Sequence, residues 1–461
     1  MEAAAKKKVG VNLTEGPIFK ALLLFVGPII LANLIQQLYS LVDLMVIGVY
    51  MGSTGTVGVS TGGEMADMLT PVATAFGAAG QIYIGQLAGA RNHRKLKEAV
   101  GTLISFMILM SLVFLVLVVI FRKQILGILN CPAEAFEQAD MYMIFTAIGL
   151  PFIFGYNAVS GILRGMGESK RPLLFIIIAA VVNIFLDILL VGPFHMESAG
   201  AAIATSASQA ASCIASLVFM NRRKESFEFE WRLSYFRIRP DAMKVILGLG
   251  VPQAARALLV RFSMLYVNAS VNAYGLTASA TNSVGNKLQK FLEVYSQSFS
   301  QAASAMVAQN LGAREPERAR KTVLYSFYSC MIMAAVTSAV VLLLPRQVFG
   351  IFTHDPDVLD MGVIYLRILI IHLFLSALTS TFQAMVIGCG NAVLNFVIGI
   401  LDGVICKIGL SLVFVRVMNM GVYGFFWGTA LSRLIPGIIC VWYFASNRWN
   451  RRRLLAETAA G

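Results

Sequence analysis

Long stretches of the chain contain no charged residue, and this constrains the fold more than any other feature. The clearest example is TLISFMILMSLVFLVLVVIF, residues 102–121. An apolar helix of about 20 residues rises about 30 Å, which is the thickness of the hydrocarbon core of a membrane. Only 13% of all residues are charged, whereas about a quarter are charged in an ordinary soluble domain. The sequence therefore predicts an all-α integral membrane protein.

Apolar segments of this kind recur along the whole chain. We count twelve, near residues 18–48, 56–82, 98–121, 134–163, 172–193, 199–220, 242–271, 276–310, 321–344, 359–387, 393–416 and 421–445. Lipid offers no hydrogen-bond partner to a backbone group, so each segment is expected to be a helix. The predicted fold therefore has twelve transmembrane helices.

Lysine and arginine residues are concentrated in every second connection between these segments. Basic clusters occur at Lys6–Lys8, in GARNHRKLK after the second segment, at 164–171, in the polar stretch after the sixth, in GAREPERARK after the eighth, and in NRWNRRR at the end. Basic connections stay in the cytoplasm, so we expect a multi-pass cell-membrane protein, surrounded by lipids, with both termini cytoplasmic. The formal net charge of +13 then reflects topology and does not indicate nucleic-acid binding.

The two halves of the chain resemble each other. GQLAGARNHRKLKEAV (85–100) returns as AQNLGAREPERARKTV (308–323), and RGMG (164–167) returns as IGCG (387–390), both 223 residues later. Each half has an even number of segments, so the halves share one orientation in the membrane. The predicted organisation is an amino-terminal lobe (1–220), a cytoplasmic linker (221–241) and a carboxy-terminal lobe (242–461). These lobes would be two six-helix bundles related by pseudo-twofold symmetry.

Two carboxylic acids, Asp43 and Asp187, lie inside apolar segments of the first half. A carboxylate costs several kcal/mol in hydrocarbon, so we expect each to have a role. Asn183 precedes Asp187 by one helical turn on the same face. Thr205 lies about six residues into the sixth segment, and at about 1.5 Å per residue the four side chains share one depth. The sequence therefore predicts an oxygen-rich, anionic pocket in the outer half of the first lobe.

Such a pocket suits a hard cation or a shared proton. Two neighbouring carboxylates cannot both ionise without a high cost, so one is expected to hold a proton, and Na⁺ could replace that proton. The alternative is that Asp43 and Asp187 cap or join helices through local hydrogen bonds. Val267 and Leu410 occupy the repeat-related positions of the second half. Acids confined to one lobe favour ion coupling, because a structural device is expected in both.

Several motifs together carry a family resemblance. They are QQLYSLVD in the first segment, the two Q-x-x-GA loops, the N-x-x-x-D pattern in the fifth segment, and GAAIAT at 200–205. From about Leu13 to Trp449 the chain resembles the MATE family of multidrug and toxic compound extrusion transporters, in its DinF-like branch. The resemblance implies two six-helix bundles around a central cavity. It also implies export of amphipathic organic compounds in antiport with H⁺ or Na⁺.

The resemblance also assigns roles to particular residues. It implies a cation-coupling site at Asp43, Asn183, Asp187 and Thr205, with a backbone carbonyl near Ala201. The four side chains would be the ligands if the coupling ion is Na⁺. These are the same four side chains that the depth comparison groups together. No cofactor is expected, only the coupling ion.

Further residues are implied to line the cavity or to assist coupling. Gln36, Tyr39 and Asn157 correspond to cavity-lining positions of the family, and hydrogen bonds between helices are an equally open interpretation. Glu64 in the second segment is a candidate relay toward Asp43. It could equally face the cavity or pair with a lysine.

The second half departs from the family pattern by its basic residues. Its apolar segments contain eight charged side chains to consider: Arg256, Arg261, Lys287, Lys290, Glu293, Asp402, Lys407 and Arg433. The simplest prediction is a buried ion pair between Asp402 and an arginine or lysine. The functional interpretation is a basic cavity wall, with Arg256 and Arg261 in the substrate cavity, which would favour anionic or zwitterionic cargo.

Other motifs limit the class of function. The six cysteines show no CxxC spacing and are expected to pack as small apolar side chains. No G-x-x-x-x-G-K-[ST] phosphate-binding loop occurs, so neither ATP-driven transport nor an enzyme is predicted. The predicted function is secondary active efflux of small amphipathic molecules by a monomer through alternating access. The alternatives are a flippase or exporter of lipid-linked or anionic substrates, and a channel or scaffold, although a channel fits poorly with one-sided carboxylates.

Overall fold

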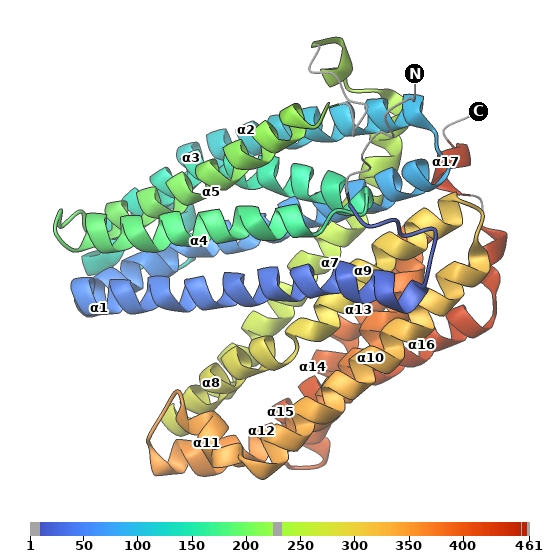
Figure 1. Ribbon diagram of the computed structural model, residues 1–461. Coiled ribbons are helices and arrows are strands. Elements are labelled where there is room, and N and C mark those ends of the chain that lie inside the picture. Colours follow the sequence, from blue (N-terminus) through green and yellow to red (C-terminus); the bar gives the residue numbers. More distant parts are fainter. Residues whose placement is uncertain (1–9, 225–232, 453, 459–461) are drawn as a thin grey trace. The chain divides into compact units, whose positions relative to one another are not determined.

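The computed structural model describes residues 10–224, 233–452 and 454–458. The predicted basic cluster Lys6–Lys8 and part of the predicted linker, residues 225–232, lie outside the described residues. Within the described chain every regular element is a helix (Figure 1), which confirms the all-α prediction. Ten helical spans of this part are long and apolar enough to cross a membrane. The helix is the expected form, because it satisfies its own backbone hydrogen bonds in lipid.

Two predicted segments are helical but are not among those ten spans. The segment 56–82 is rich in glycine, serine and threonine and also contains Glu64 and Asp67. The segment 276–310 contains Lys287, Lys290 and Glu293. Polar and charged side chains lower the hydropathy of both segments.

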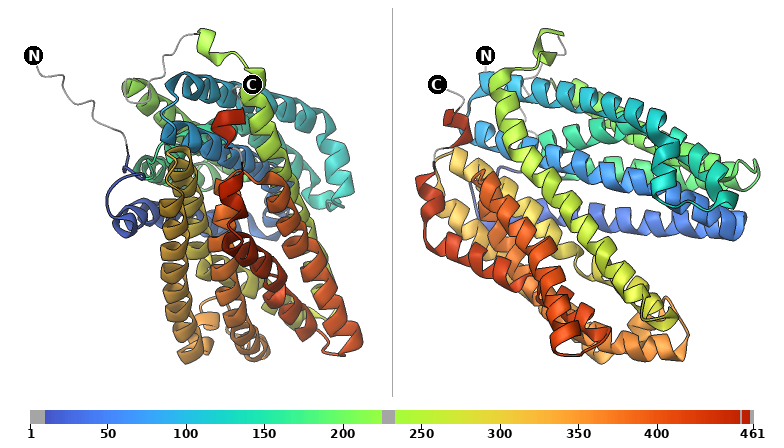
Figure 2. Two further views of the ribbon diagram at one scale, coloured as in Figure 1. Left: turned by 90° about the vertical axis from the view of Figure 1, so that its right-hand side faces the viewer. Right: turned by 180° about the vertical axis from the view of Figure 1, so that it is seen from behind.

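The chain divides into two compact units. The first contains Gly27–Gly250, and the second contains Leu13–Val26 with the described residues from Val251 onward. The first unit is built from α1 (Ile18–Gly89), α2 (His93–Ile128), η1 (Ala133–Ala135), α3 (Phe136–Gly165), α4 (Lys170–Val191), α5 (Glu197–Arg222), η2 (Leu233–Phe236) and the beginning of α7 (Pro240–Asn272). Within it α3 packs against α2 and α5, and α5 packs against α4 (Figure 2).

Local helical geometry in α1 continues across residues 49–55, where the sequence predicted a connection. The chain nevertheless reverses there. Asp43 approaches Asp187, and the Tyr50 ring lies against Gly192, so the first part of α1 runs parallel to α4. In the second part of α1, Gly62 lies against Ala139 and Gly77 against Asn157, so this part runs parallel to α3. Because α3 and α4 follow each other in the chain and run antiparallel, the two parts of α1 also run antiparallel. The single helix thus provides two antiparallel segments.

The second unit contains more and shorter helices. They are the rest of α7, α8 (Leu276–Leu292), α9 (Val294–Gly312), α10 (Pro316–Leu343), α11 (Pro345–Gly350), α12 (Pro356–Gly388), α13 (Ala392–Ile400), η3 (Leu401–Cys406), α14 (Lys407–Leu412), η4 (Val413–Val417), α15 (Tyr423–Leu431), α16 (Leu434–Ala445), η5 (Arg448–Arg451) and α17 (Leu455–Thr458).

Three of the predicted helical segments in this unit are interrupted, a detail that the sequence analysis did not address. The segment 276–310 breaks at Glu293, between α8 and α9. The segment 393–416 contains two π-helical stretches, η3 and η4. The segment 421–445 breaks at Ser432 and Arg433, between α15 and α16. Charged side chains at these breaks contact one another, which is the physical reason described below.

The internal repeat extends to backbone geometry. Arg91 and Arg314, 223 positions apart, both have left-handed backbone conformations with φ of 53° and 59°. Gly167 and Gly390, at the same separation, have φ of 85° and 76°. Positive φ is uncommon outside glycine, so its recurrence at matched positions indicates that both halves use the same turns.

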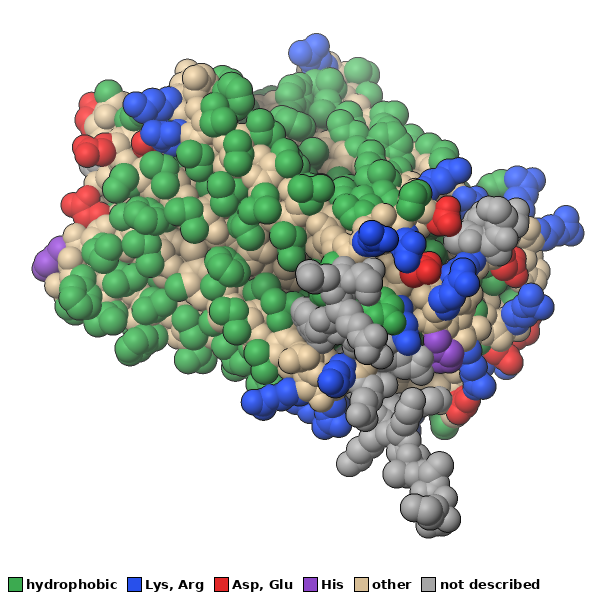
Figure 3. Space-filling view, turned by 90° about the horizontal axis from the view of Figure 1, so that it is seen from above, with side chains coloured by type: hydrophobic (Ala, Val, Ile, Leu, Met, Phe, Trp, Pro, Cys, Tyr) green, Lys and Arg blue, Asp and Glu red, His purple; other side chains and the backbone are tan. Residues whose placement is uncertain are grey.

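The exterior is largely apolar. On α2 the side chains of Leu109, Val113, Val116 and Ile120 are exposed and follow one another at helical spacing. Figure 3 shows apolar side chains over most of the face that it presents. A stripe of this kind fits contact with lipid rather than water. The six cysteines are free, and five of them are buried, which confirms that they pack as small apolar side chains.

Candidate functional site

In the first unit, α4 and α1 bring the two predicted acids together. Asp187 is 0% exposed and Asn183 is 2% exposed. The first part of α1 places the half-buried Asp43 within hydrogen-bonding reach of Asp187. A proton held between the two carboxyl groups would therefore bridge them.

The oxygen atoms of this group are left without donors. Neither oxygen of Asp187, nor Oδ1 of Asn183 or of Asp43, reaches hydrogen-bonding geometry with a donor in the described residues. Leaving a buried polar atom unsatisfied costs about 1–3 kcal/mol, and more when it is charged. Oxygen atoms are also the ligands that hard cations prefer. The arrangement can therefore hold a proton or a hard cation such as Na⁺.

The remaining predicted members of this site lie on α5. Ala201 is fully buried and packs in an apolar cluster with Ile47 and Tyr142. Thr205 lies within hydrogen-bonding reach of the Tyr142 hydroxyl, and Tyr142 is electrostatically close to Asp43. Tyr142 was not predicted, because an isolated tyrosine in an apolar segment gives no signal in the sequence. The structure thus groups the two acids with Asn183, and Tyr142 connects this group to Thr205.

The other predicted residues of the first unit take part in contacts between helices. The Tyr39 hydroxyl lies within reach of Gln36 and Gln209. The Asn157 amide donates to the Ile153 carbonyl at 2.8 Å and accepts from the Thr74 hydroxyl at 3.3 Å, which connects α3 to the second part of α1. Glu64 is half-buried on the second part of α1.

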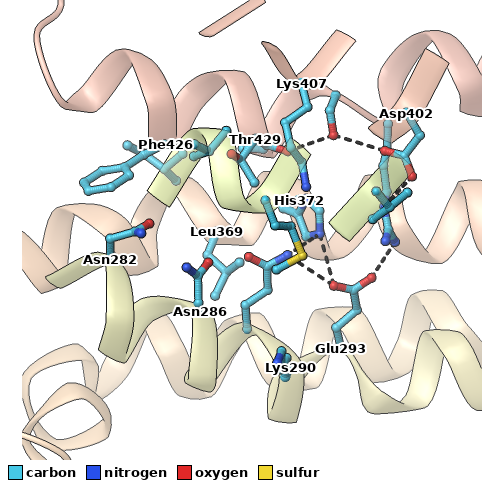
Figure 4. Close-up of a pocket in the computed structure, with 18 of the residues that line it drawn as sticks. Asn282, Asn286, Lys290, Glu293, Leu369, His372, Asp402, Lys407, Phe426 and Thr429 are labelled. Atoms are coloured by element: carbon cyan, nitrogen blue, oxygen red, sulfur yellow. Dashed lines mark hydrogen bonds and ion pairs between the residues drawn. The ribbon is translucent and has the colours of Figure 1, made fainter. Parts of the chain in front are cut away.

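In the second unit, three charged residues from interrupted helices form one network. The Arg433 guanidinium lies 2.5 Å from Oε1 of Glu293 and 3.7 Å from Oδ2 of Asp402. The predicted ion pair of Asp402 is therefore confirmed, with Arg433 as its partner. Because one guanidinium serves two carboxylates, it holds η3 to the break between α8 and α9 (Figure 4).

Polar groups of α8 and α12 complete the network around Glu293, which is 4% exposed. The Ser376 hydroxyl donates to Oε1 of Glu293 at 2.8 Å, and Nε2 of His372 lies 3.2 Å from Oε2. Nε2 of Gln289 lies 3.3 Å from the same oxygen. His372 and Ser376 were missed by the sequence analysis. The signal that could have found them is a histidine in the middle of an apolar segment.

A cavity of about 190 Å³ adjoins this network within the second unit. Its polar wall includes Asn268, Asn282 and Asn286, and the cations Lys290 and Lys407 also line it. Its apolar wall includes Leu369, Tyr365 and Phe426. Figure 4 shows the labelled members of both walls around one space.

The predicted basic residues of α7 do not line this cavity. Neither Arg256 nor Arg261 belongs to its lining. The stem of Arg256 passes within 2.2 Å of where a Cβ at position 399 would lie, so Gly399 makes room for it. Arg256 is also electrostatically close to Asp402.

Comparison with known proteins gives matches over most of the chain. The MatE family model matches the chain twice, over residues 28–189 and 252–413. The probable multidrug resistance protein YoeA of Bacillus subtilis is 28% identical over 364 residues, covering 78% of this chain and 79% of YoeA. The multidrug export protein MepA of Staphylococcus haemolyticus is 22% identical over 446 residues, covering 97% of each chain.

Solved structures of the same fold are also found. A crystal structure of MATE in complex with MaD3S has a TM-score of 0.90 and 19% identity, covering 99% of this chain and 100% of that one. A transporter of the MOP superfamily from Pyrococcus furiosus, described as having reverse polarity of its binding pocket, has a TM-score of 0.91 and 20% identity, covering 97% and 100%. These likenesses show a shared fold over the whole chain.

Proposed function

The chain belongs to the MatE family, and on that premise we propose that it exports amphipathic organic compounds across the cell membrane in exchange for H⁺ or Na⁺. The observation that carries the proposal is the close pair of Asp43 and the buried Asp187, in which both oxygen atoms of Asp187 and Oδ1 of Asp43 lack donors in the described chain. A pair of this kind is costly unless a cation visits it. Similarity to the multidrug resistance protein YoeA and the multidrug export protein MepA supports drug-like cargo.

The proposed coupling follows from the charge of the pair. With both acids ionised, repulsion disfavours close packing of α1 against α4, and a proton or Na⁺ removes that repulsion. Asn183 and Thr205 supply neutral oxygen atoms to the same site, with the carbonyl near Ala201. A ligand shifts a conformational equilibrium only by its differential affinity for the two states. The charge state of the two acids supplies that difference.

The proposed cellular arrangement rests on the basic connections. Both termini and the 221–241 linker face the cytoplasm. The linker joins an amino-terminal lobe of residues 1–220 to a carboxy-terminal lobe of residues 242–461. The protein acts as a monomer in the cell membrane. The DinF-like branch assignment rests on the sequence motifs alone.

Transport from proteoliposomes tests this function. The purified protein is reconstituted with an entrapped fluorescent amphiphile, and a pH gradient and a Na⁺ gradient are imposed separately. We expect efflux with at least one gradient and none when both are collapsed. Efflux that persists without any gradient would contradict secondary active antiport.

A second candidate function is a flippase or exporter for anionic or lipid-linked substrates. The observation that favours it is the excess of cations around the cavity of the second unit. The neighbour described as having a binding pocket of reverse polarity is consistent with such variation on this fold. Movement of a fluorescent anionic lipid between leaflets, independent of ion gradients, would support this candidate over the first.

A further inference from the structure

Three membrane helices of the second unit are interrupted at charged residues that meet. Glu293 lies at the break between α8 and α9, Asp402 in the π-helical stretch η3, and Arg433 at the break between α15 and α16. Each lies near the middle of its span. Interrupted helices near the membrane midplane are where transporters build binding sites, and π-helical stretches are frequent at functional sites. The cavity therefore lies where a binding site is expected.

The two carboxylates of this region share one guanidinium. Glu293 is paired with Arg433, and Asp402 is paired with the same guanidinium and accepts from the Ser432 hydroxyl at 3.1 Å. Both acids therefore have partners within the protein. A cationic ligand would have to displace Arg433 to reach them.

The lysines of the cavity have no close partner of this kind. Within the described chain, the side chains of Lys290 and Lys407 form no hydrogen bond or ion pair, although both line the cavity and Lys407 is electrostatically close to Asp402. Lys407 is half-buried, and Figure 4 shows its amine directed into the space beside His372. With Arg433, the lining has three cations against two carboxylates, so one positive charge is in excess.

The asparagines of the opposite wall are oriented by their own hydrogen bonds. Oδ1 of Asn268 accepts from Asn282 at 2.8 Å and from Asn286 at 3.1 Å. Because both bonds use the carbonyl oxygen, the N–H groups of Asn268 are available to a ligand in the cavity. Amide donors and a lysine that line one cavity suit an oxyanion.

The size of the cavity indicates what part of a ligand it holds. The cavity measures about 190 Å³. Sites for whole drug-sized ligands measure about 300–1,000 Å³. The space therefore suits a polar head group, with Phe426 and Leu369 beside it for the start of an apolar body.

We propose that this cavity binds the anionic head group of an amphipathic cargo, with Lys407 as its main countercharge and Asn268 as a donor. Carboxylate, sulfonate and phosphate share the required chemistry. The inference rests on the proposed export function and adds a substrate class: anionic or zwitterionic amphiphiles are bound more tightly than cationic ones of equal apolar size.

A binding experiment with two matched probes tests the inference. The full-length protein in phosphatidylcholine nanodiscs is titrated with dansylaminoundecanoate and with the dansyl amphiphile of equal length that ends in trimethylammonium. We expect tighter binding of the carboxylate and a Kd at least about tenfold higher for Lys407→Gln, since one charged contact is removed. Lys287→Gln, on the same helix as Lys290 but exposed and outside the cavity, should bind as wild type.

Two further variants test whether a loss of binding by Lys407→Gln comes from the lost charge and not from misfolding. Lys407→Arg keeps the charge and should retain preference for the carboxylate. Asn286→Asp introduces a negative charge into the wall and should reverse the preference toward trimethylammonium. Unchanged carboxylate binding by Lys407→Gln, or tighter binding of trimethylammonium by wild type, overturns the inference.

The source of the anion is distinguished by lipid composition. If phosphatidylglycerol in the nanodisc raises the carboxylate Kd for wild type but not for Lys407→Gln, the lipid phosphate competes for the same anion site, which supports the inference. Equal competition in both proteins places the carboxylate elsewhere and overturns it. The assay uses no gradient, so a protein that exports cations but fails it would leave the proposed export function standing.

Discussion

The Nη1 atom of Arg433 lies 2.5 Å from Oε1 of Glu293, so a break between two helices is joined to a break between two others by one ion pair. Both side chains are largely buried, with 18% and 5% exposed. Breaking a buried pair by removing one partner leaves an uncompensated charge. That costs about 3–5 kcal/mol, whereas an exposed pair contributes about 0–1 kcal/mol.

The first prediction is that Arg433→Gln strongly destabilises the protein. The loss leaves Glu293 and Asp402 without their shared cation, and thermal unfolding in detergent should show a clear fall in Tm. Arg346→Gln is the matched control, because Arg346 pairs with the exposed Asp360 and should change Tm little. Equal Tm values for the two variants would show that the buried network does not hold the breaks together.

The helices of this protein were predictable from local sequence, whereas the breaks were not. An apolar run specifies a membrane helix wherever it is long enough, because lipid leaves the backbone no alternative. A charged residue such as Glu293 or Arg433 lowers the local hydropathy, but this does not show whether the helix is interrupted there or which distant side chain it contacts. Long-range contacts of this kind are outside the reach of a pattern within one segment.

Some residues of the candidate sites were likewise predictable from local sequence, and others were not. Asp43 and Asp187 were predicted to share one depth because helical rise converts sequence position into depth, and the structure does bring them together. Tyr142 and His372 could not be assigned, because depth alone does not say which faces of neighbouring helices meet. Arg256 was predicted on a cavity wall, and it packs against Gly399 instead of lining the cavity of the second unit.

The second prediction concerns the two acids of the first unit. Asp187→Asn or Asp43→Asn should reduce gradient-driven efflux from proteoliposomes to the level of protein-free vesicles, because the amide cannot exchange a proton. The fold should remain, since the amide has nearly the same size as the carboxyl group and leaves no charge to bury. Asp357→Asn, at an exposed position, should transport as wild type. A variant that is inactive and also unfolded would instead indicate a structural role.

The third prediction concerns topology and uses single cysteines in a Cys131→Ser background, because the other native cysteines are buried. Arg237 and Glu134 are both exposed, in connections expected on opposite sides of the membrane. A membrane-impermeant maleimide applied to intact cells should label Glu134→Cys and not Arg237→Cys. The reverse pattern would invert the orientation.

Labelling of native Cys131 in the wild-type protein is expected to depend on pH. Burial raises the pKa of its thiol, with an opposing effect from Thr61. The thiolate is the reactive form, so a raised pKa lowers the reactive fraction at neutral pH. Labelling from outside should therefore be slow near about pH 7 and rise steeply toward about pH 10. A rate that stays constant over this range would show that reagent access, and not ionisation, limits the reaction.

The last prediction joins cargo binding to the charge of the first-unit site. If the ionised and protonated states of Asp43 and Asp187 favour different conformations, cargo that selects one conformation must change proton occupancy, and the coupling is reciprocal. Adding cargo to detergent-solubilised protein in weak buffer without Na⁺ should therefore release protons. Asp187→Asn should reduce that release sharply, while Asp357→Asn should not. Cargo binding by wild type with neither proton release nor any dependence on Na⁺ would exclude this pair as the coupling site, and the gradient-independent flippase would become the better account of the molecule.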